Sequence, residues 1–275
     1  MGSSGLTCLG KLVGVAVPDT ILEERDSLRD RTVKLGMIAR ACSIYGADVV
    51  QVFPGGGRGE GDLIRKILEY LETPQYLRKR LYRLDEDLSF AGLLPPLRGP
   101  SHKPKVPIEK LKPGEVREGV VNQDGTVDIG LDMAPILVGK SVPGRRVTIR
   151  VASTDPLRAE LIERKDVGDY WGYVVESASI SSVFEDMRFP LTVATSRFGA
   201  PLNSTIVELG KDVRASAGVK LMFGSPSRGL FDIVGPSLSS KARFVLNLFP
   251  EQHVETVRTE EAIFAGLGLL STLIL

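Results

Sequence analysis

The chain has 275 residues, of which 43% are hydrophobic and 25% charged, with 29 glycines and 17 prolines. These values exclude a disordered, collagenous or fibrous chain and fit one large domain or two smaller ones. Because 35 basic residues balance 34 acidic ones, the net charge of +1 indicates neither a wholly basic nucleic-acid binder nor an acidic tail.

Metal and membrane sites are also disfavoured. Two cysteines, Cys8 and Cys42, cannot build a disulfide framework, and two histidines make a zinc site unexpected. Residues 1–10 lack the basic and apolar regions of a signal peptide, and the apolar stretch 262–275 is too short to span a bilayer. We therefore expect a cytoplasmic protein without metal or membrane partner. Its apolar C-terminus is expected to be a helix buried in the core or against a second subunit.

The first 73 residues alternate between strand and helix patterns. Residues 11–17 and 47–53 are predicted strands, while 30–46 and 61–71 carry apolar side chains at helical spacing. This β-α-β-α order with apolar strands predicts a parallel sheet.

Between residues 74 and 166 the pattern changes. Repeated prolines between 95 and 113 exclude a long helix or a central strand there. Five short strands without a helical crossover are then predicted, at 116–121, 126–131, 136–138, 146–151 and 158–163. Five such strands indicate a small OB-like β-barrel.

This inserted segment carries a basic excess. Residues 78–165 hold 17 basic and 12 acidic residues, so the insert is the part expected to meet phosphates. The candidate RNA-binding residues are Arg145, Arg146, Arg150 and Arg158. The usual alternative for any one of them is a solvated surface charge.

From residue 167 the α/β rhythm returns. Strands are predicted at 170–175, 191–195, 219–223 and 243–248, with helices at 179–187, at 204–213 and from Thr259. The chain therefore divides into an α/β domain of residues 1–73 and 167–275 and an inserted linker and barrel of residues 74–166.

Two glycine-rich segments follow buried strands, and neither carries a nucleotide fingerprint. Residues 55–61 contain no G-x-G-x-x-G and no Walker lysine, which favours a mobile loop. Residues 224–229 begin like a P-loop, but Leu230 and Phe231 replace its Lys and Ser/Thr. What remains is a turn where a flat ligand can approach main-chain groups.

Three strand-end segments are expected to converge. Residues 194–199, 224–229 and 247–250 each follow a predicted parallel strand, so they meet at the carboxyl edge where open α/β folds bind ligands. In residues 256–262, Thr259 suits a helix N-cap and Glu260 and Glu261 suit the helix start. Arg258 is disfavoured there and is therefore a site candidate.

Five segments together resemble one family: TPQYLR at 73–78, YWGY at 170–173, ATSR at 194–197, FG at 223–224 and TVRTEEA at 256–262. With them, nearly the whole chain resembles the RNA uridine-N3 methyltransferases of the SPOUT superfamily, the archaeal members most. The resemblance implies an α/β domain with a C-terminal trefoil knot, interrupted by the OB-like barrel, in a homodimer. It also implies S-adenosyl-L-methionine as cofactor and ribosomal RNA as substrate.

In the resembled superfamily the three knot loops hold the cofactor. Carried over, the cofactor-binding set is Thr195, Ser196, Arg197, Phe223, Gly224, Ser225, Gly229, Asn247, Leu248, Phe249, Pro250, Thr256, Arg258 and Thr259. For catalysis, Arg258 or Arg197 would stabilise charge on the uridine carbonyls, and Glu261 or Glu260 would accept the N3 proton. The alternative for both glutamates is a role in the helix start alone.

Two other functions stay open. One is an RNA-binding or rRNA-chaperoning protein whose knot lacks methyl transfer. The other is a different nucleotide enzyme, which the missing Rossmann and Walker fingerprints disfavour. The three convergent loops favour the methyltransferase.

Overall fold

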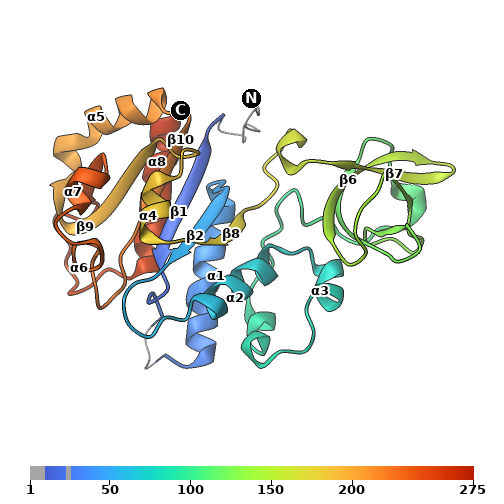
Figure 1. The fold of residues 1–275 in the computed structure, drawn as a ribbon, viewed down its shortest axis with the longest axis horizontal. Coiled ribbons are helices and arrows are strands. Elements are labelled where there is room, and N and C mark those ends of the chain that lie inside the picture. Colours follow the sequence, from blue (N-terminus) through green and yellow to red (C-terminus); the bar gives the residue numbers. More distant parts are fainter. Residues whose placement is uncertain (1–9, 23–25) are drawn as a thin grey trace. The chain divides into compact units, whose positions relative to one another are not determined.

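The computed structural model describes residues 10–22 and 26–275, so the predictions for residues 1–9, Cys8 included, lie outside the described residues. The chain forms two compact units (Figure 1). Unit 1 holds Tyr70–Glu86 and Pro96–Gly172; unit 2 holds the described residues up to Glu69, Asp87–Pro95 and Tyr173–Leu275. Asp87–Pro95, which was expected in the insert of residues 74–166, therefore belongs to unit 2. Its Leu94 packs so closely on Gly36 that a Cβ there would lie 2.6 Å from Leu94 Cδ2.

Unit 2 is built on a parallel sheet, which confirms the predicted α/β class. The strand order is β11-β9-β10-β1-β2-β8, and every pair is parallel. The strands are β1 (Leu12–Pro18), β2 (Val49–Phe53), β8 (Val174–Ser177), β9 (Leu191–Pro201), β10 (Gly218–Met222) and β11 (Phe244–Asn247). β1, β2 and β10 are almost wholly buried, as the continuous apolar patterns require.

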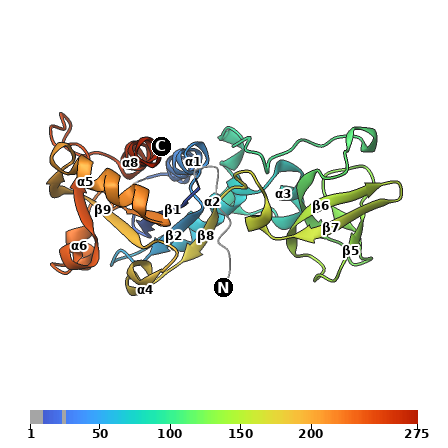
Figure 2. The same cartoon turned by 90° about the horizontal axis from the view of Figure 1, so that it is seen from above.

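Helices cover the sheet on two faces. They are α1 (Leu28–Ile44), α2 (Gly61–Glu72), α4 (Ile180–Glu185), α5 (Leu202–Ala215), α6 (Leu230–Val234), α7 (Leu238–Lys241) and α8 (Thr259–Ile274). α1 and α8 lie side by side on one face, and α4 lies on the other (Figure 2). An apolar cluster joins α4, α6 and α7 to the sheet through Val183, Leu230, Leu238 and Met222. No helix within the described ranges is long and apolar enough to cross a membrane.

Two features of these helices bear on the sequence analysis. Burial of Cys42 in α1 raises the pKa of its thiol to about 12, so that side chain acts as a small apolar residue. The short helices α6 and α7 were not predicted, because four or five residues are too few to show helical periodicity.

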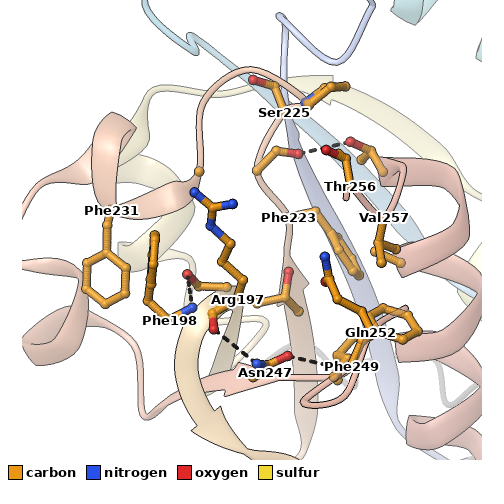
Figure 3. Close-up of a pocket in the computed structure, with 18 of the residues that line it drawn as sticks. Arg197, Phe198, Phe223, Ser225, Phe231, Asn247, Phe249, Gln252, Thr256 and Val257 are labelled. Carbon is orange, nitrogen blue, oxygen red and sulfur yellow. Dashed lines mark hydrogen bonds between the residues drawn. The ribbon is translucent and has the colours of Figure 1, made fainter. Parts of the chain in front are cut away.

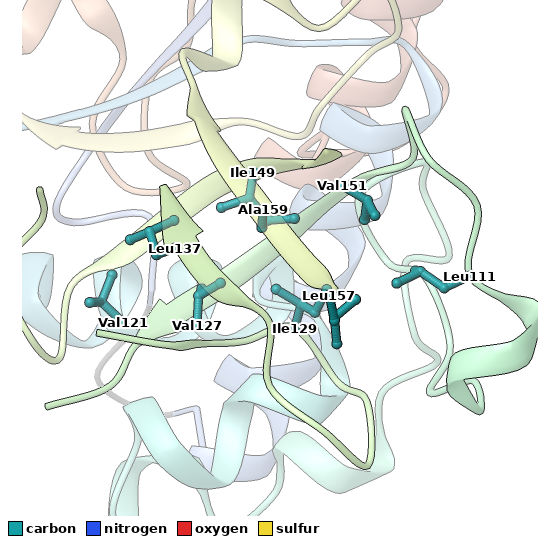
Figure 4. Close-up of a cluster of buried hydrophobic side chains, with 9 residues drawn as sticks. All are labelled: Leu111, Val121, Val127, Ile129, Leu137, Ile149, Val151, Leu157 and Ala159. Atoms are coloured by element: carbon teal, nitrogen blue, oxygen red, sulfur yellow. The ribbon is translucent and has the colours of Figure 1, made fainter. Parts of the chain in front are cut away.

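Unit 1 contains the five-stranded sheet. Its strands are β3 (Val116–Val121), β4 (Val127–Asp128), β5 (Ile136–Val138), β6 (Arg146–Thr154) and β7 (Leu157–Ile162), in the order β4-β3-β6-β7-β5. An antiparallel bridge between Thr126 and Ile136 joins the two edges of this sheet. Nine buried residues, among them Val127, Ile129 and Ile149, fill its interior (Figure 4).

A short helix, α3 (Gln75–Leu81), precedes this sheet and was not predicted. Pro74 is its N-cap residue, and the helix ends before the proline-rich segment. The strand expected at 170–175 begins only at Val174, since Gly172 has a left-handed φ of +88°. At Gly172 a Cβ would lie 2.3 Å from Glu72 Oε1, so both its backbone and its neighbours require glycine.

A buried ionic network joins the two chain ends of unit 1. Arg146 donates to Glu72 Oε2 and to Glu118 Oε2, each at 2.6 Å. Arg164 donates to Glu72 Oε1 at 2.7 Å, and Trp171 Nε1 donates to Glu118 Oε1 at 2.6 Å. The two carboxylates are 4% and 2% exposed, so the network is nearly dry.

These partners decide the charge of Glu118. Burial alone would raise its pKa, but Arg146, Arg164 and the hydrogen bonds from Thr148 and Trp171 hold that pKa below its ordinary value of 4.5. A depressed carboxyl pKa adds stability at neutral pH that is lost as the pH falls below 4.5.

We expect Arg146→Met to lower the free energy of unfolding by about 3 kcal/mol or more, because it leaves two buried carboxylates without their cation. The matched change Arg150→Met should cost under about 1 kcal/mol, since that arginine is 40% exposed and 3.4 Å from Glu160. Urea unfolding followed by fluorescence of Trp171, the single tryptophan, measures both. Equal losses would contradict a structural role for the network.

Candidate functional site

A pocket forms in unit 2 where β9, β10 and β11 end. It has a volume of about 230 Å³ (Figure 3). Its lining comes from a stretch within β9, from the segments that follow β10 and β11, and from the chain that leads into α8. The expected convergence at one edge of the sheet is therefore found, but β9 continues past the predicted end at residue 195 to Pro201, so residues 195–199 are a detour within that strand.

The first wall is a detour in β9. Ala194 pairs with Val245 and Ala200 with Leu246, so residues 195–199 leave the ladder between two consecutive residues of β11. At Gly199 the chain rejoins the ladder, where a Cβ would lie 2.6 Å from Val245 O. The detour carries Arg197 and Phe198, with the Arg197 guanidinium 4.7 Å from the Phe198 ring centre.

The second wall is the glycine turn after β10. Ser225 N donates to Arg228 O at 2.9 Å, and Arg228 N donates to Ser225 Oγ at 3.1 Å. Gly224 is held tightly, because a Cβ there would lie 3.1 Å from Arg228 O. The Asp232 carboxylate accepts from Gly229 N at 2.9 Å.

Arg228 anchors this turn to the other glycine-rich segment. Its guanidinium donates to Gly55 O at 2.9 Å, to Gly56 O, and to Asp232 O at 3.1 Å. Gly55 N in turn donates to Asp19 at 2.8 Å. Residues 55–56, which were expected in a mobile loop, are therefore hydrogen-bonded through Arg228 to the glycine turn that lines the pocket.

Side-chain hydrogen bonds tie the walls together. Thr195 Oγ1 donates to Met222 O at 3.0 Å and so joins the β9 detour to the end of β10. Asn247 Nδ2 donates to Arg197 O at 3.0 Å and so joins β11 to the detour. Thr259 Oγ1 donates to Gly224 O at 3.1 Å and fixes the start of α8 to the glycine turn. The pocket is thereby preorganised by its own side chains.

The start of α8 differs from the prediction. Arg258, not Thr259, is the N-cap residue, and Thr259 is the first helical residue. Glu261 accepts a hydrogen bond from Arg258 N at 2.9 Å, which gives it a capping role. Arg258 is exposed, and Glu260 is buried with 4% of its surface exposed. None of these three charged residues lines the pocket.

Most of the expected cofactor residues lie in this pocket. Its lining includes Thr195, Ser196, Arg197, Phe223, Gly224, Ser225, Gly229, Asn247, Leu248, Phe249, Thr256 and Thr259. Pro250 and Arg258 are absent from the lining.

The lining also holds residues outside the expected cofactor-binding set: Phe198, Pro226, Ser227, Val257 and Ala262, which lie in segments that the sequence analysis singled out, and Phe231, Asp232, Gln252 and Glu255, which do not. Several of them are neighbours in the sequence of an expected cofactor-binding residue, and this adjacency is the signal by which they could have been found. Arg228 carried no local signal as an anchor, since its bonds run to Gly55 and Gly56, whereas Asp232 caps its own helix three residues from Gly229.

The expected RNA-binding arginines of unit 1 are not equivalent. Arg146 is wrong as a free phosphate ligand, because its guanidinium is committed to Glu72 and Glu118. Arg150 lies 3.4 Å from Glu160. Arg145 and Arg158 are exposed.

The chemistry of the pocket is that of a polar and aromatic small-molecule site. Phe223, Leu248 and Phe249 offer apolar surface, while the glycine turn and the β9 detour offer main-chain groups. Within the described part of the chain, no group of three or more His, Cys, Asp or Glu side chains is arranged to hold a metal ion.

The chain is similar to several known proteins. A family model described as "Putative RNA methyltransferase" matches residues 12–270. An uncharacterized protein of Haloarcula marismortui is 34% identical, over 94% of this chain and 98% of its own. The 28S rRNA (uridine-N(3))-methyltransferase of Homo sapiens is 32% identical, over 94% of this chain and 77% of its own.

Two solved structures are also similar. One, an RNA 2′-O ribose methyltransferase, is 11% identical with a TM-score of 0.40, over 94% of this chain and 55% of its own. The other, the SpoU methyltransferase AviRb from Streptomyces viridochromogenes in complex with AdoMet, is 10% identical with a TM-score of 0.39, over 95% and 57%. Since the family model spans nearly the whole chain and the relatives match it over 94% of its length, the protein belongs to this family of RNA methyltransferases.

Proposed function

We propose that this enzyme transfers a methyl group from S-adenosyl-L-methionine to N3 of a uridine in ribosomal RNA. The observation that carries the proposal is the preorganised pocket at the ends of β9, β10 and β11, lined by twelve of the fourteen expected cofactor residues. The printed activity of the human relative supports the choice of substrate.

The residues present fit the cofactor. Phe223, Leu248 and Phe249 would hold the adenine, and main-chain groups of the glycine turn would read its edge. The Ser196 hydroxyl, on the β9 detour, is suited to the carboxylate of the methionine part. Bound there, the cofactor would supply a methyl group that its positive sulfur already activates. The chain's own task is to position the acceptor and remove its proton.

Arg197 and Phe198 form the acceptor side of the proposed site. Phe198 is 71% exposed, and the Arg197 guanidinium stacks on its ring. Unstacked RNA bases bind to such planar surfaces, and the target uridine would have to be extruded or already single-stranded. Arg197 would then stabilise negative charge on the uridine carbonyls.

Glu255 is the better proton acceptor. It lines the pocket and is exposed, whereas Asp232 caps Gly229 and Glu261 caps α8. Within the described ranges, its carboxylate has no hydrogen-bond donor or cation in contact, so it is available to the N3 proton of the uridine. We therefore assign the base to Glu255 in place of the predicted Glu261.

We further propose the finer fold and domain features that the resemblance implied. The order of β10, β9 and β11, with α8 returning to Gly224 and α1, is compatible with a trefoil knot. The bridged five-stranded sheet of unit 1 supports an OB-like insert that contacts RNA. An experimental electron-density trace of residues 116–275 would test both features.

A homodimer is the proposed assembly. Val33, Met37 and Ile44 are exposed on α1, at spacings that place them on one helical face beside α8. Arg258, outside its own pocket and exposed, would then be available to the site of a partner subunit.

S-adenosyl-L-methionine should bind saturably at one site per chain in a calorimetric titration. Gly224→Val should weaken binding about tenfold or more, because the turn has no room for a side chain. Gly92→Val is the control, since nothing lies within 4 Å of a Cβ there. Binding by neither the folded enzyme nor its RNA complex would contradict the proposal and leave an RNA-binding or rRNA-chaperoning protein in its place.

Glu255→Gln should slow methyl transfer by about 10²-fold or more without weakening cofactor binding, because it removes the proposed base. Glu261→Gln should leave the rate nearly unchanged and lower the unfolding free energy by up to about 1 kcal/mol, since only the helix start is affected. Single-turnover rates with tritiated cofactor measure the first effect. The reverse pattern would restore Glu261 as the base.

In solution the protein should have twice the 29.8 kDa mass of one chain. Met37→Glu should shift it towards the monomer, because a charge would be buried at the proposed α1 contact. Met187→Glu, at a position 83% exposed and away from α1, serves as the control. Light scattering after size exclusion gives the masses, and a monomeric wild type would refute the dimer.

A further inference from the structure

A second hollow lies wholly within unit 1. It has a volume of about 740 Å³ and lies between the start of α3 and the proline-rich segment 96–105. Its lining includes Tyr76, Arg98, His102, Lys103, Pro104 and Lys105, and no lining residue is acidic. The volume is within the range of about 300–1,000 Å³ that small-molecule sites occupy.

The hollow carries positive charge that the protein does not neutralise. Lys103 lies 3.5 Å from Glu115, but that carboxylate also accepts from Arg117 at 2.8 Å. Arg98 and Lys105 are both exposed. Throughout the described ranges, no carboxylate lies within 4.0 Å of either cation. Cations gathered around one concave surface favour an anionic ligand.

Arg98 is held against its backbone preference. Its φ is +53°, and it is the one residue other than glycine with a positive φ among the described residues. The left-handed region costs a residue with a Cβ conformational energy, and Gly99 stands next to it in the sequence. Such strain placed on a residue that lines a charged hollow points to a role for that side chain.

The walls of the hollow are fixed. Tyr76 Oη donates to Glu118 O at 2.7 Å, and the Tyr76 ring lies against Gly130, where a Cβ would come within 2.6 Å of it. Arg117 Nη1 donates to Pro104 O at 3.0 Å. His102 contacts Leu71 O at 3.2 Å, and burial lowers the pKa of its ring. At neutral pH, His102 therefore contributes a polar wall and not a charge.

We propose that this hollow binds the sugar–phosphate backbone of a single-stranded segment of the RNA substrate, through Arg98 and Lys105. This inference rests on the proposed function, because it takes RNA as the substrate. A concave site beside an aromatic ring and prolines suits an unpaired nucleotide, whereas a duplex cannot enter it. The proposal places the main phosphate contact in segment 96–105 and not on the barrel arginines, of which Arg146 is paired with Glu72 and Glu118.

The test compares two double variants with the same change of charge. Binding of a short single-stranded RNA to the full-length protein is measured by fluorescence anisotropy at several salt concentrations. Arg98→Gln with Lys105→Gln should weaken binding about tenfold. It should also reduce the slope of log affinity against log salt concentration by about 1.4, or about 0.7 for each phosphate that is no longer bound. Arg145→Gln with Arg158→Gln should have a clearly smaller effect on both. Equal effects would overturn the proposal, because net charge alone would then explain binding.

Arg98→Gly separates folding from binding. Glycine suits a φ of +53°, so the melting temperature should stay the same or rise while RNA affinity falls. Unchanged RNA affinity in this variant would remove Arg98 from the site.

Two further measurements identify the ligand and its source. Duplex RNA that binds as tightly as the single strand, with the same loss in the Arg98/Lys105 variant, would overturn the single-strand assignment. Competition by uridine monophosphate or inorganic phosphate at low concentration would instead indicate a site for free anions. If the wild type binds S-adenosyl-L-methionine and RNA, but the variant binds RNA equally well, this inference fails and the proposed function stands. If the wild type binds no RNA, both fail.

Discussion

Parallel pairing of β9, β10 and β11 is the constraint on which the candidate site depends. Because all three strands run in one direction, the β9 detour and the segments that follow β10 and β11 meet at one edge, and no single segment forms the pocket. Three side-chain hydrogen bonds, from Thr195, Asn247 and Thr259, then hold these segments to one another. The shape of the site is therefore set by strand direction together with these three side-chain to main-chain bonds.

Unit 1 is organised around buried charge. Glu72 and Glu118 lie near the entry and centre of the unit, and Arg146, Arg164 and Trp171 bring its last residues back to them. The recognisable motifs at 73–78 and 170–173 flank this network, so part of what marks the family in the sequence is structural. The basic residues of the insert therefore fall into two groups. Some arginines neutralise internal carboxylates, while Arg98 and Lys105 face a hollow without an acidic neighbour.

Sequence reasoning was most successful where periodicity or chain direction decides the structure. The parallel sheet, the bounds of β3 and β5, and the convergence of three strand ends all follow from local patterns. It was least successful where partners lie far apart in the chain. Arg146 was expected to face RNA because its contact with Glu72, 74 positions away, has no local signature. The anchoring role of Arg228 was missed for the same reason, because Gly55 lies 173 positions away. Glu255 stands outside every motif of the sequence, and Glu261 was considered as a base although its position suited a cap.

The hydrogen bond from Thr259 to Gly224 couples two parts of unit 2 that the sequence separates by 35 positions. Since that bond belongs both to the glycine turn and to the first turn of α8, ordering of one stabilises the other. α8 packs along α1, so the contact proposed for a second subunit on α1 would be connected to the turn through this bond. In the proposed homodimer, ligand binding and association would then be linked equilibria, and whatever factor one applied to the affinity of the other would be returned unchanged.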